Sequence, residues 1–204
     1  MEFYMRPLSV SDLDQCVTVE TAAFPPAEAA TREKIEYRLT VCPQICLGLF
    51  ARESRSNSEG ATHQGAIPAF NPPNATKNDK LIAHTISTKS LSPVVQDEDM
   101  SVPPTWKTEP TATYNVGHQP KGRTITLHSL AVAPPFQKLG HGKTLMTHYI
   151  EHMRQTAQAE RISILTYDRL VSYYQKLGFI HYGKSRCEYA GVAWHDLAYE
   201  FNTI

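Results

Sequence analysis

Residues 127–143 read LHSLAVAPPFQKLGHGK, an apolar segment that is followed by two prolines and then by two closely spaced glycines. The apolar part predicts a β-strand, and the residues after the glycines have the apolar spacing of a helix. Gly140 and Gly142 would let the backbone turn tightly and leave free N–H groups at the start of this helix. This strand–loop–helix order predicts a binding site for a phosphate-rich ligand.

Three kinds of phosphate-binding loop, and a turn without any ligand, compete to explain this segment. A dinucleotide-binding loop needs a third glycine where the sequence has Leu145. A nucleoside-triphosphatase loop would end in Gly142-Lys143-Thr144, but its first glycine would fall on Gln137. The pattern that remains is Gln-x-x-Gly-x-Gly, and a ligand-free strand-to-helix turn stays open as the alternative.

Several segments resemble the GNAT superfamily of acyltransferases, in particular its arylalkylamine (serotonin-type) and polyamine N-acetyltransferases. The Gln-x-x-Gly-x-Gly pattern is similar to the loop with which this superfamily binds the pyrophosphate of coenzyme A. Residues 173–179, YYQKLGF, resemble the segment that carries an acid near the coenzyme sulfur. Residues 126–132, TLHSLAV, and 39–50, LTVCPQICLGLF, are similar to two segments of the arylalkylamine enzymes. The combination is more specific than any single motif.

The apolar and turn residues predict the element order β-α-α-β-β-β-α-β-α-β-β, and the length fits one domain. This element order is that of the GNAT fold, an α/β architecture with a mixed, twisted sheet of about seven strands and helices on both faces. The resemblance implies that residues 1–204 form a single N-acetyltransferase domain. Strands are expected at 3–7 (a sheet edge), 45–52, 81–88, 123–132, 162–166, 179–189 and 192–201. Helices are expected after Ser11, after Thr31, and at 140–158 and 169–177.

Two segments interrupt this pattern. Residues 53–80 are rich in Ser, Gly, Asn and Pro and have few large apolar side chains, which predicts a flexible insertion between two strands. Residues 89–122 form a second, Pro-rich loop that carries the acidic run Asp97-Glu98-Asp99.

Composition limits the partners of the chain. The formal net charge is +0, so we do not expect nucleic acid as a partner. No apolar run reaches membrane-spanning length and residues 1–6 lack a signal-peptide core, so we expect a cytoplasmic monomer with reduced thiols that does not bind membranes. We expect no metal, because Cys42 and Cys46 lack a second ligand pair. Residues 148–152, HYIEH, match a zinc-peptidase motif formally, but a solvated helix face explains them better.

The resemblance implies acetyl-CoA as the cosubstrate and also implies the residues that would hold it. The backbone of Leu130, Ala131 and Val132 would pair with the pantetheine arm in the manner of a neighbouring strand. The pyrophosphate would be bound, mostly through main-chain groups, by the loop residues Lys138, Leu139, Gly140, His141, Gly142 and Lys143.

Acetyl transfer to an amine requires a group that takes a proton from the amine and a group that gives one to the leaving thiolate. We predict His128 as the base, and since it lies two residues before Leu130, both side chains should face the same side of the sheet. The family has two histidines on this strand, and Thr126 stands at the second position, where a hydroxyl can only relay a proton. Tyr174 is the predicted acid beside the coenzyme sulfur, with Tyr173 as a packing residue. A hydrogen-bonded core histidine remains the alternative for His128.

Phe24 and Trp194 align with aromatic positions of the family's amine pocket, and we place Thr126 on the substrate side as well. The acidic run 97–99 either attracts a cationic amine or is a solvated charge run. We predict an enzyme that transfers acetyl from acetyl-CoA to the primary amine of a small arylalkylamine (serotonin, tryptamine or tyramine type) or a polyamine. Two alternatives stay open: a protein lysine or N-terminal acetyltransferase, and a catalytically silent acyl-CoA-binding regulatory module.

Overall fold

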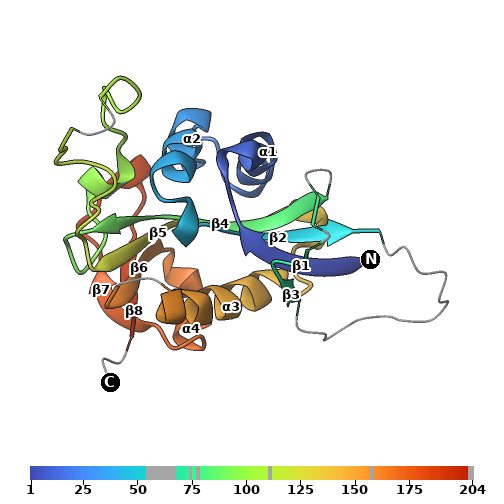
Figure 1. Cartoon of the computed structure of the whole chain (residues 1–204). Coiled ribbons are helices and arrows are strands. Elements are labelled where there is room, and N and C mark those ends of the chain that lie inside the picture. Colours follow the sequence, from blue (N-terminus) through green and yellow to red (C-terminus); the bar gives the residue numbers. More distant parts are fainter. Residues whose placement is uncertain (54–67, 74, 77–78, 110–111, 157–158, 202–204) are drawn as a thin grey trace.

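The computed structural model describes residues 1–53, 68–73, 75–76, 79–109, 112–156 and 159–201. This part of the chain forms one mixed sheet of eight strands and four α-helices. Helices α1 (Leu13–Ala23) and α2 (Arg32–Val41) cover one face of the sheet, and α3 (His141–Thr156) and α4 (Val171–Gln175) lie on the other (Figure 1). No helix in these described ranges is long and apolar enough to cross a bilayer.

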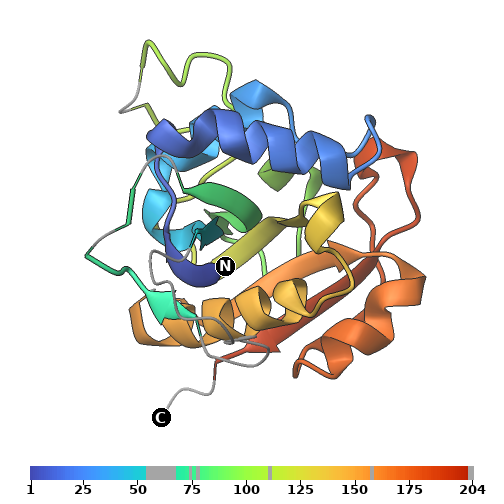
Figure 2. The ribbon, with the colours of Figure 1, turned by 90° about the vertical axis from the view of Figure 1, so that its right-hand side faces the viewer.

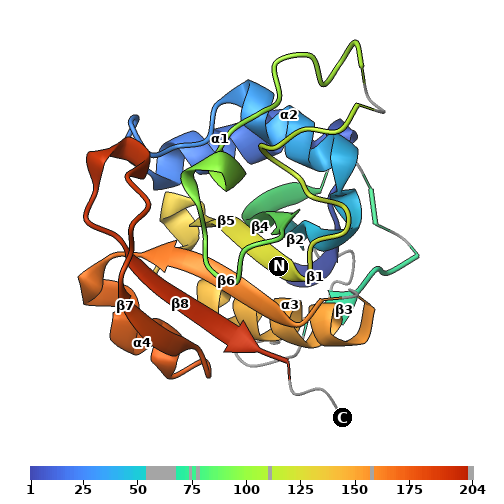
Figure 3. The same ribbon diagram turned by 90° about the vertical axis from the view of Figure 1, so that its left-hand side faces the viewer.

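The strands are ordered β3-β1-β2-β4-β5-β6-β8-β7 across the sheet. Their bounds are Glu2–Pro7 (β1), Leu47–Arg52 (β2), Ala69–Phe70 (β3), Lys80–Ser90 (β4), Thr124–Val132 (β5), Arg161–Thr166 (β6), Ile180–Lys184 (β7) and His195–Glu200 (β8). The pairs β5–β6 and β1–β3 are parallel, and the other pairs are antiparallel. Figure 3 shows β6, β8 and β7 together at one end of the sheet, with α4 beside them.

The predicted fold class and element order are confirmed, and the strand count is one higher than predicted. The additional strand, β3, lies inside the predicted insertion 53–80 and pairs with Tyr4 and Met5, so β1 is not at the sheet edge. The predicted flexibility of that insertion concerns mainly residues 54–67, which lie outside the described residues. The helix predicted at 169–177 starts later than expected, because a 3-10 turn at 168–170 precedes α4. The two closing strands are also shorter than expected.

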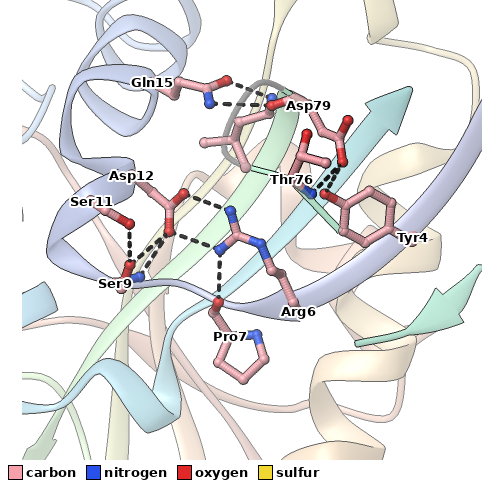
Figure 4. A network of polar contacts seen from close by, with 10 residues as sticks. Tyr4, Arg6, Pro7, Ser9, Ser11, Asp12, Gln15, Thr76 and Asp79 are labelled. Carbon is pink, nitrogen blue, oxygen red and sulfur yellow. Dashed lines mark hydrogen bonds and ion pairs between the residues drawn. The ribbon is translucent and has the colours of Figure 1, made fainter. Parts of the chain in front are cut away.

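The start of α1 differs from the prediction, because Asp12 and not Ser11 precedes its first residue. Arg6 of β1 donates two hydrogen bonds to the Asp12 carboxylate, at 2.8 and 2.7 Å, and the Ser9 N–H donates a third at 2.9 Å (Figure 4). These bonds fix α1 against the first strand. The predicted cap of α2 is confirmed, since the Thr31 hydroxyl accepts a hydrogen bond from the N–H of Lys34 at 3.3 Å.

Helices lie on both faces of the sheet (Figure 2), and two apolar clusters fill the space between these helices and the sheet. Helix α3 contributes an apolar stripe to one of these clusters: Met146, Tyr149, Ile150 and Met153, at the spacing that the sequence predicts for this helix, together with Leu145. The three- and four-residue spacing of this stripe places it on one side of the helix, which explains why α3 packs along the sheet. The opposite cluster contains apolar residues of α1 and α2.

Two irregularities around β5 create the space for a site. β5 and β6 pair from Thr124 and Arg161 only as far as Leu127 and Ile164, although β5 continues to Val132. The two strands therefore part after Leu127. On its other side, β5 has a bulge, because Ile86 of β4 pairs with Ser129 while Ser87 pairs with Leu127. His128 is the extra residue of this bulge.

Candidate active site

A cavity of ≈120 Å³ lies where β5 and β6 part. Its lining includes five of the residues predicted for the site: Phe24, His128, Leu130, Tyr174 and Trp194. These residues come from the end of α1, from β5, from α4 and from the segment before β8. Residues that are far apart in the sequence therefore line the same cavity, at the point where β5 and β6 separate.

His128 is partly buried and bonded through both ring nitrogens. Its Nε2 lies 2.8 Å from the Thr88 hydroxyl, and its Nδ1 lies 3.3 Å from the Met100 sulfur. Burial holds the pKa of this imidazole well below its usual value, and the positive charges of Arg38 and Lys34 lower it further. At neutral pH the imidazole is therefore uncharged.

The expectation that His128 and Leu130 face the same side of the sheet is wrong. Leu130 packs against the apolar cluster on the α3 side, whereas His128 bonds Thr88 and is influenced by two cations of α2. The bulge is the cause, since an extra residue shifts the alternation of side chains by one position. Both residues still line the cavity, because it opens at the edge of β5.

Tyr174 is buried, and its side chain lines the cavity, whereas Tyr173 is not part of the lining. Burial raises the pKa of the Tyr174 phenol, and the neighbouring Tyr173 raises it further, so the phenol is neutral and can donate a proton. Its ring packs against Phe179 and Tyr173, with centroids 5.5 and 5.0 Å away.

Thr126 is not among the residues that line the cavity. Its side chain is fully buried, and its hydroxyl has no hydrogen-bond partner among the described residues. Thr126 pairs across the sheet with Thr88, the residue whose hydroxyl bonds His128. The structure therefore does not bring Thr126 to the place that the sequence assigned to it.

The predicted phosphate loop precedes α3 and is exposed, with Lys138 at φ +62° and Gly140 at φ +88°. The Gln137 side-chain amide donates a hydrogen bond to the Val132 carbonyl at 2.9 Å and so holds the loop against the end of β5. The first loop-to-helix bond runs from the N–H of Thr144 to the carbonyl of Gly140, at 3.0 Å. Before it, the N–H groups of residues 138–143 have no acceptor among the described residues.

Free N–H groups just before and in the first turn of a helix of 16 residues are suited to an anion, because the helix dipole adds to their partial charges. Gly142 also sits close to β5, since a Cβ atom there would lie 3.4 Å from Val132 Cγ2. The loop thus fits a diphosphate group, and the part of β5 that does not pair with β6, from His128 to Val132, leads from the loop to the cavity.

Sequence reasoning missed a buried carboxylate in the cavity wall, Glu20 of α1. Its Oε2 accepts hydrogen bonds from Ser129 Oγ at 2.5 Å and from His84 Nε2 at 2.9 Å. Glu20 was visible in the sequence only as a charged residue on the otherwise apolar face of the first helix. That pattern is a signal for a buried functional charge.

Sequence reasoning also missed the residues whose hydrogen bonds connect the walls of the cavity. Tyr167, after β6, donates its hydroxyl hydrogen bond to the Glu28 carboxylate, and the Tyr189 hydroxyl donates to the Glu28 carbonyl at 3.2 Å. The rings of Tyr167 and Trp194 lie 5.1 Å apart, and Trp194 Nε1 donates to the Tyr189 carbonyl at 2.8 Å. These contacts connect the segment after α1 with segments on the far side of the cavity.

The acidic run 97–99 does not line the cavity, and two of its carboxylates accept hydrogen bonds from residues outside the run. The Asp97 carboxylate accepts hydrogen bonds from Cys187 Sγ at 2.9 Å and from the N–H of Glu188 at 3.1 Å. Asp99 accepts one from the N–H of Gln96 at 2.9 Å. Within the described ranges, no group of three or more His, Cys, Asp or Glu side chains is arranged to hold a metal ion.

A larger hollow of ≈880 Å³ lies between α2 and the Pro-rich segment, lined by residues such as Tyr37, Trp106 and His118. It contains none of the residues predicted for the site. The smaller cavity is the better candidate, because it lies at the parting of β5 and β6.

The fold and the loop define the class of this protein. Residues 70–179, more than half of the chain, match the model of the acetyltransferase (GNAT) family, and the chain belongs to this family. It is 24% identical over 147 residues to a serotonin N-acetyltransferase of Mesocricetus auratus, a match that covers 72% of this chain and 51% of that protein. The chain therefore spans about half the length of this curated relative.

Two solved structures show how widely the fold is shared. The loading GNATL domain of CurA from Lyngbya majuscula superposes with a TM-score of 0.67 at 14% identity, covering 98% of both chains. Naa50 of Arabidopsis thaliana, in complex with a bisubstrate analogue of coenzyme A and a peptide, superposes with a TM-score of 0.59 at 11% identity, covering 98% of this chain and 100% of that one. At these identities the likeness concerns the fold alone.

Proposed function

We propose that this chain transfers the acetyl group of acetyl-CoA to the primary amine of a small arylalkylamine or polyamine. The observation that carries the proposal is the size and lining of the cavity between β5 and β6. A volume of ≈120 Å³ is small beside the roughly 300–1,000 Å³ of pockets for drug-sized ligands. Its aromatic walls and its one deeply buried carboxylate suit a small aromatic or aliphatic body with a cationic end.

The loop before α3 supports acetyl-CoA as the cosubstrate. The six free N–H groups of residues 138–143 would hold its diphosphate, with charge added by Lys138 and Lys143. The edge of β5 that does not pair with β6, at Leu130, Ala131 and Val132, would hold the pantetheine arm by strand-like hydrogen bonds. When bound, acetyl-CoA supplies an activated acetyl group as a thioester.

We assign His128 as the base and Tyr174 as the acid. His128, neutral because of its lowered pKa, takes the proton of the amine nitrogen as that nitrogen forms its bond to the acetyl carbon. Tyr174 gives its phenol proton to the sulfur as the carbon–sulfur bond breaks, since the thiolate has a pKa of about 8.5 and leaves more easily when protonated. His128 holds its proton only weakly, so the proton passes on to water.

A protein lysine or N-terminal acetyltransferase is the nearest alternative. A peptide acceptor needs an open groove, whereas the bonds of Tyr167 and Tyr189 to Glu28 draw the cavity walls together. This favours a small amine over a peptide. A silent acyl-CoA-binding module would bind the coenzyme but lack turnover, and His128 and Tyr174 at one cavity speak against it.

A steady-state comparison tests the proposal. Tyramine, tryptamine and spermidine are compared with an N-terminal peptide at saturating acetyl-CoA, and coenzyme binding is measured by calorimetry. We expect turnover of at least one small amine and a much lower kcat/KM for the peptide. Preferred peptide acetylation would replace the small-amine proposal, and coenzyme binding without any turnover would replace it with the silent module.

A further inference from the structure

We propose that Glu20 holds the ammonium group of the acceptor amine, in a buried anionic site that it forms with His84 and Ser129. This inference rests on the function proposed above and adds the group that recognises the charge of the substrate. It assigns Glu20 to substrate binding and leaves proton transfer to His128.

The carboxylate of Glu20 is held from three directions. Ser129 of β5 and His84 of β4 donate to Oε2, at 2.5 and 2.9 Å, and the N–H of Ala30 donates to Oε1 at 3.0 Å. His84 Nε2 must carry the hydrogen, because a carboxylate oxygen only accepts. The side chain is 3% exposed and lines the cavity, so its orientation is fixed before any ligand arrives.

The Glu20 carboxylate can accept one more hydrogen bond than the described residues donate to it. An ionised carboxylate has about four acceptor positions on its two oxygens. Ser129, His84 and Ala30 use three of them. The remaining position of Glu20 fits a hydrogen of a primary ammonium, and that bond would be charge-assisted.

The charge around Glu20 also favours a cation. Burial alone would raise the pKa of Glu20, but the hydrogen bond and electrostatic interaction with His84 hold the pKa below its ordinary value, helped by the hydrogen bonds from Ser129 and from the N–H of Ala30. The carboxylate is thus ionised. In the described part of the chain, His84 is the one basic side chain within salt-bridge distance of Glu20, and it bears a charge only when protonated.

More distant groups also face Glu20, and they come from three elements: Arg38 of α2, Tyr189 after β7 and Cys16 of α1. None of them bonds the carboxylate within the described ranges. Arg38 is a buried cation whose charge offsets part of that of Glu20 without bonding it. A cationic ligand that bonds the carboxylate directly would lower the cost of burying this charge further.

The rest of the cavity wall fits the remainder of such a substrate. The ring of Phe24 and the paired rings of Tyr167 and Trp194 provide apolar and aromatic surface in the same cavity. An arylalkylamine has a flat ring and an ammonium joined by a short chain. The ring would contact the aromatic wall while the ammonium reaches Glu20.

The test compares two acceptors that differ in charge but little in shape. One is phenethylamine, a cation at neutral pH, and the other is a β,β-difluorinated phenethylamine, whose ammonium is much more acidic and which is largely neutral at mildly alkaline pH. For Glu20→Gln we expect KM for the cation to rise about tenfold or more, since a charge-assisted bond is lost, with kcat within a few-fold. KM for the neutral acceptor should stay within about twofold.

Two controls accompany Glu20→Gln. Glu36→Gln removes a carboxylate of α2 that is paired with Lys107 outside the cavity, and it should leave both KM values unchanged. Calorimetry should give the same affinity of Glu20→Gln for coenzyme A as the wild type, which shows that the variant is folded. Equal losses for both acceptors, or a fall in kcat with KM unchanged, would overturn the assignment.

The wild-type protein provides a second test if Glu20→Gln fails to fold. KM for the total fluorinated amine is measured as the pH passes the amine's own pKa. If Glu20 binds the ammonium, KM rises as the pH passes above that pKa. A KM that falls as the neutral form accumulates would refute the proposal. Acetylation of either acceptor by the wild type tests the underlying function separately.

Discussion

Replacing His141 by proline tests whether the main chain at the start of α3 binds the coenzyme. His141 is the first residue of α3, and its N–H has no acceptor among the described residues. Proline is favoured at the first position of a helix, where the missing N–H costs the fold nothing. The preceding Gly140, at φ +88°, has no Cβ to clash with the proline ring. His141→Pro should therefore fold while removing one of six donors.

The expected loss follows from the value of one hydrogen bond to an ionised group, about 1.5–3 kcal/mol. At about 1.4 kcal/mol per factor of ten, this is roughly a 10- to 100-fold weaker Kd for coenzyme A. The five other N–H groups of residues 138–143 can share the phosphate oxygens, so we expect a loss near the lower end, about tenfold.

Isothermal calorimetry with coenzyme A measures this effect against a matched control, His141→Ala. The alanine variant also loses the imidazole, whose ring lies 4.8 Å from that of Phe3, but it keeps the N–H. The difference between the two variants therefore isolates the main-chain donor, and thermal unfolding of both checks the fold. Equal affinities of His141→Pro and His141→Ala would refute the role of this N–H group in binding the diphosphate.

Three further predictions concern catalysis and stability. Tyr174→Phe should lower kcat by about 100-fold or more with acetyl-CoA affinity within a few-fold, and an unchanged kcat in steady-state assays would exclude Tyr174 as the acid. His128→Gln should lose more activity at low pH than at high pH. The wild-type imidazole stays neutral down to its depressed pKa, and a base is most needed where the amine is protonated. A pH–rate profile in which the loss is the same at every pH would contradict this role. Gly178→Ala should lower the free energy of unfolding by about 1–3 kcal/mol in urea titrations. The backbone of Gly178 has φ +95°, and the new Cβ would lie 2.9 Å from the Tyr199 ring. Unchanged stability would show that this turn relaxes.

The parts of the fold that depend on local patterns could be predicted from the sequence. The stripe of α3 follows from helical spacing, and the Thr31 cap follows from a hydroxyl that accepts an N–H three residues later. The loop before α3 could be located because its glycines and Gln137 lie close together in the chain. Each of these features depends on residues within a few positions of one another.

The parts that depend on distant partners could not be predicted. The bulge at His128 exists because β4 and β5 pair in two registers, and no residue of β5 alone indicates this. The pairing of Ala69 with Tyr4 is equally invisible in a segment that reads as an insertion. Glu20 becomes part of the site only when α1 brings it against His84 and Ser129, which follow it by 64 and 109 residues.

A crystal structure of this protein with bound coenzyme A would test the central claim most directly. We predict the diphosphate within hydrogen-bonding distance of the N–H groups of residues 138–143 and the pantetheine arm between β5 and β6. The sulfur should end in the cavity that His128 and Tyr174 line. A coenzyme bound elsewhere, or an empty turn before α3 at saturating coenzyme, would contradict the account.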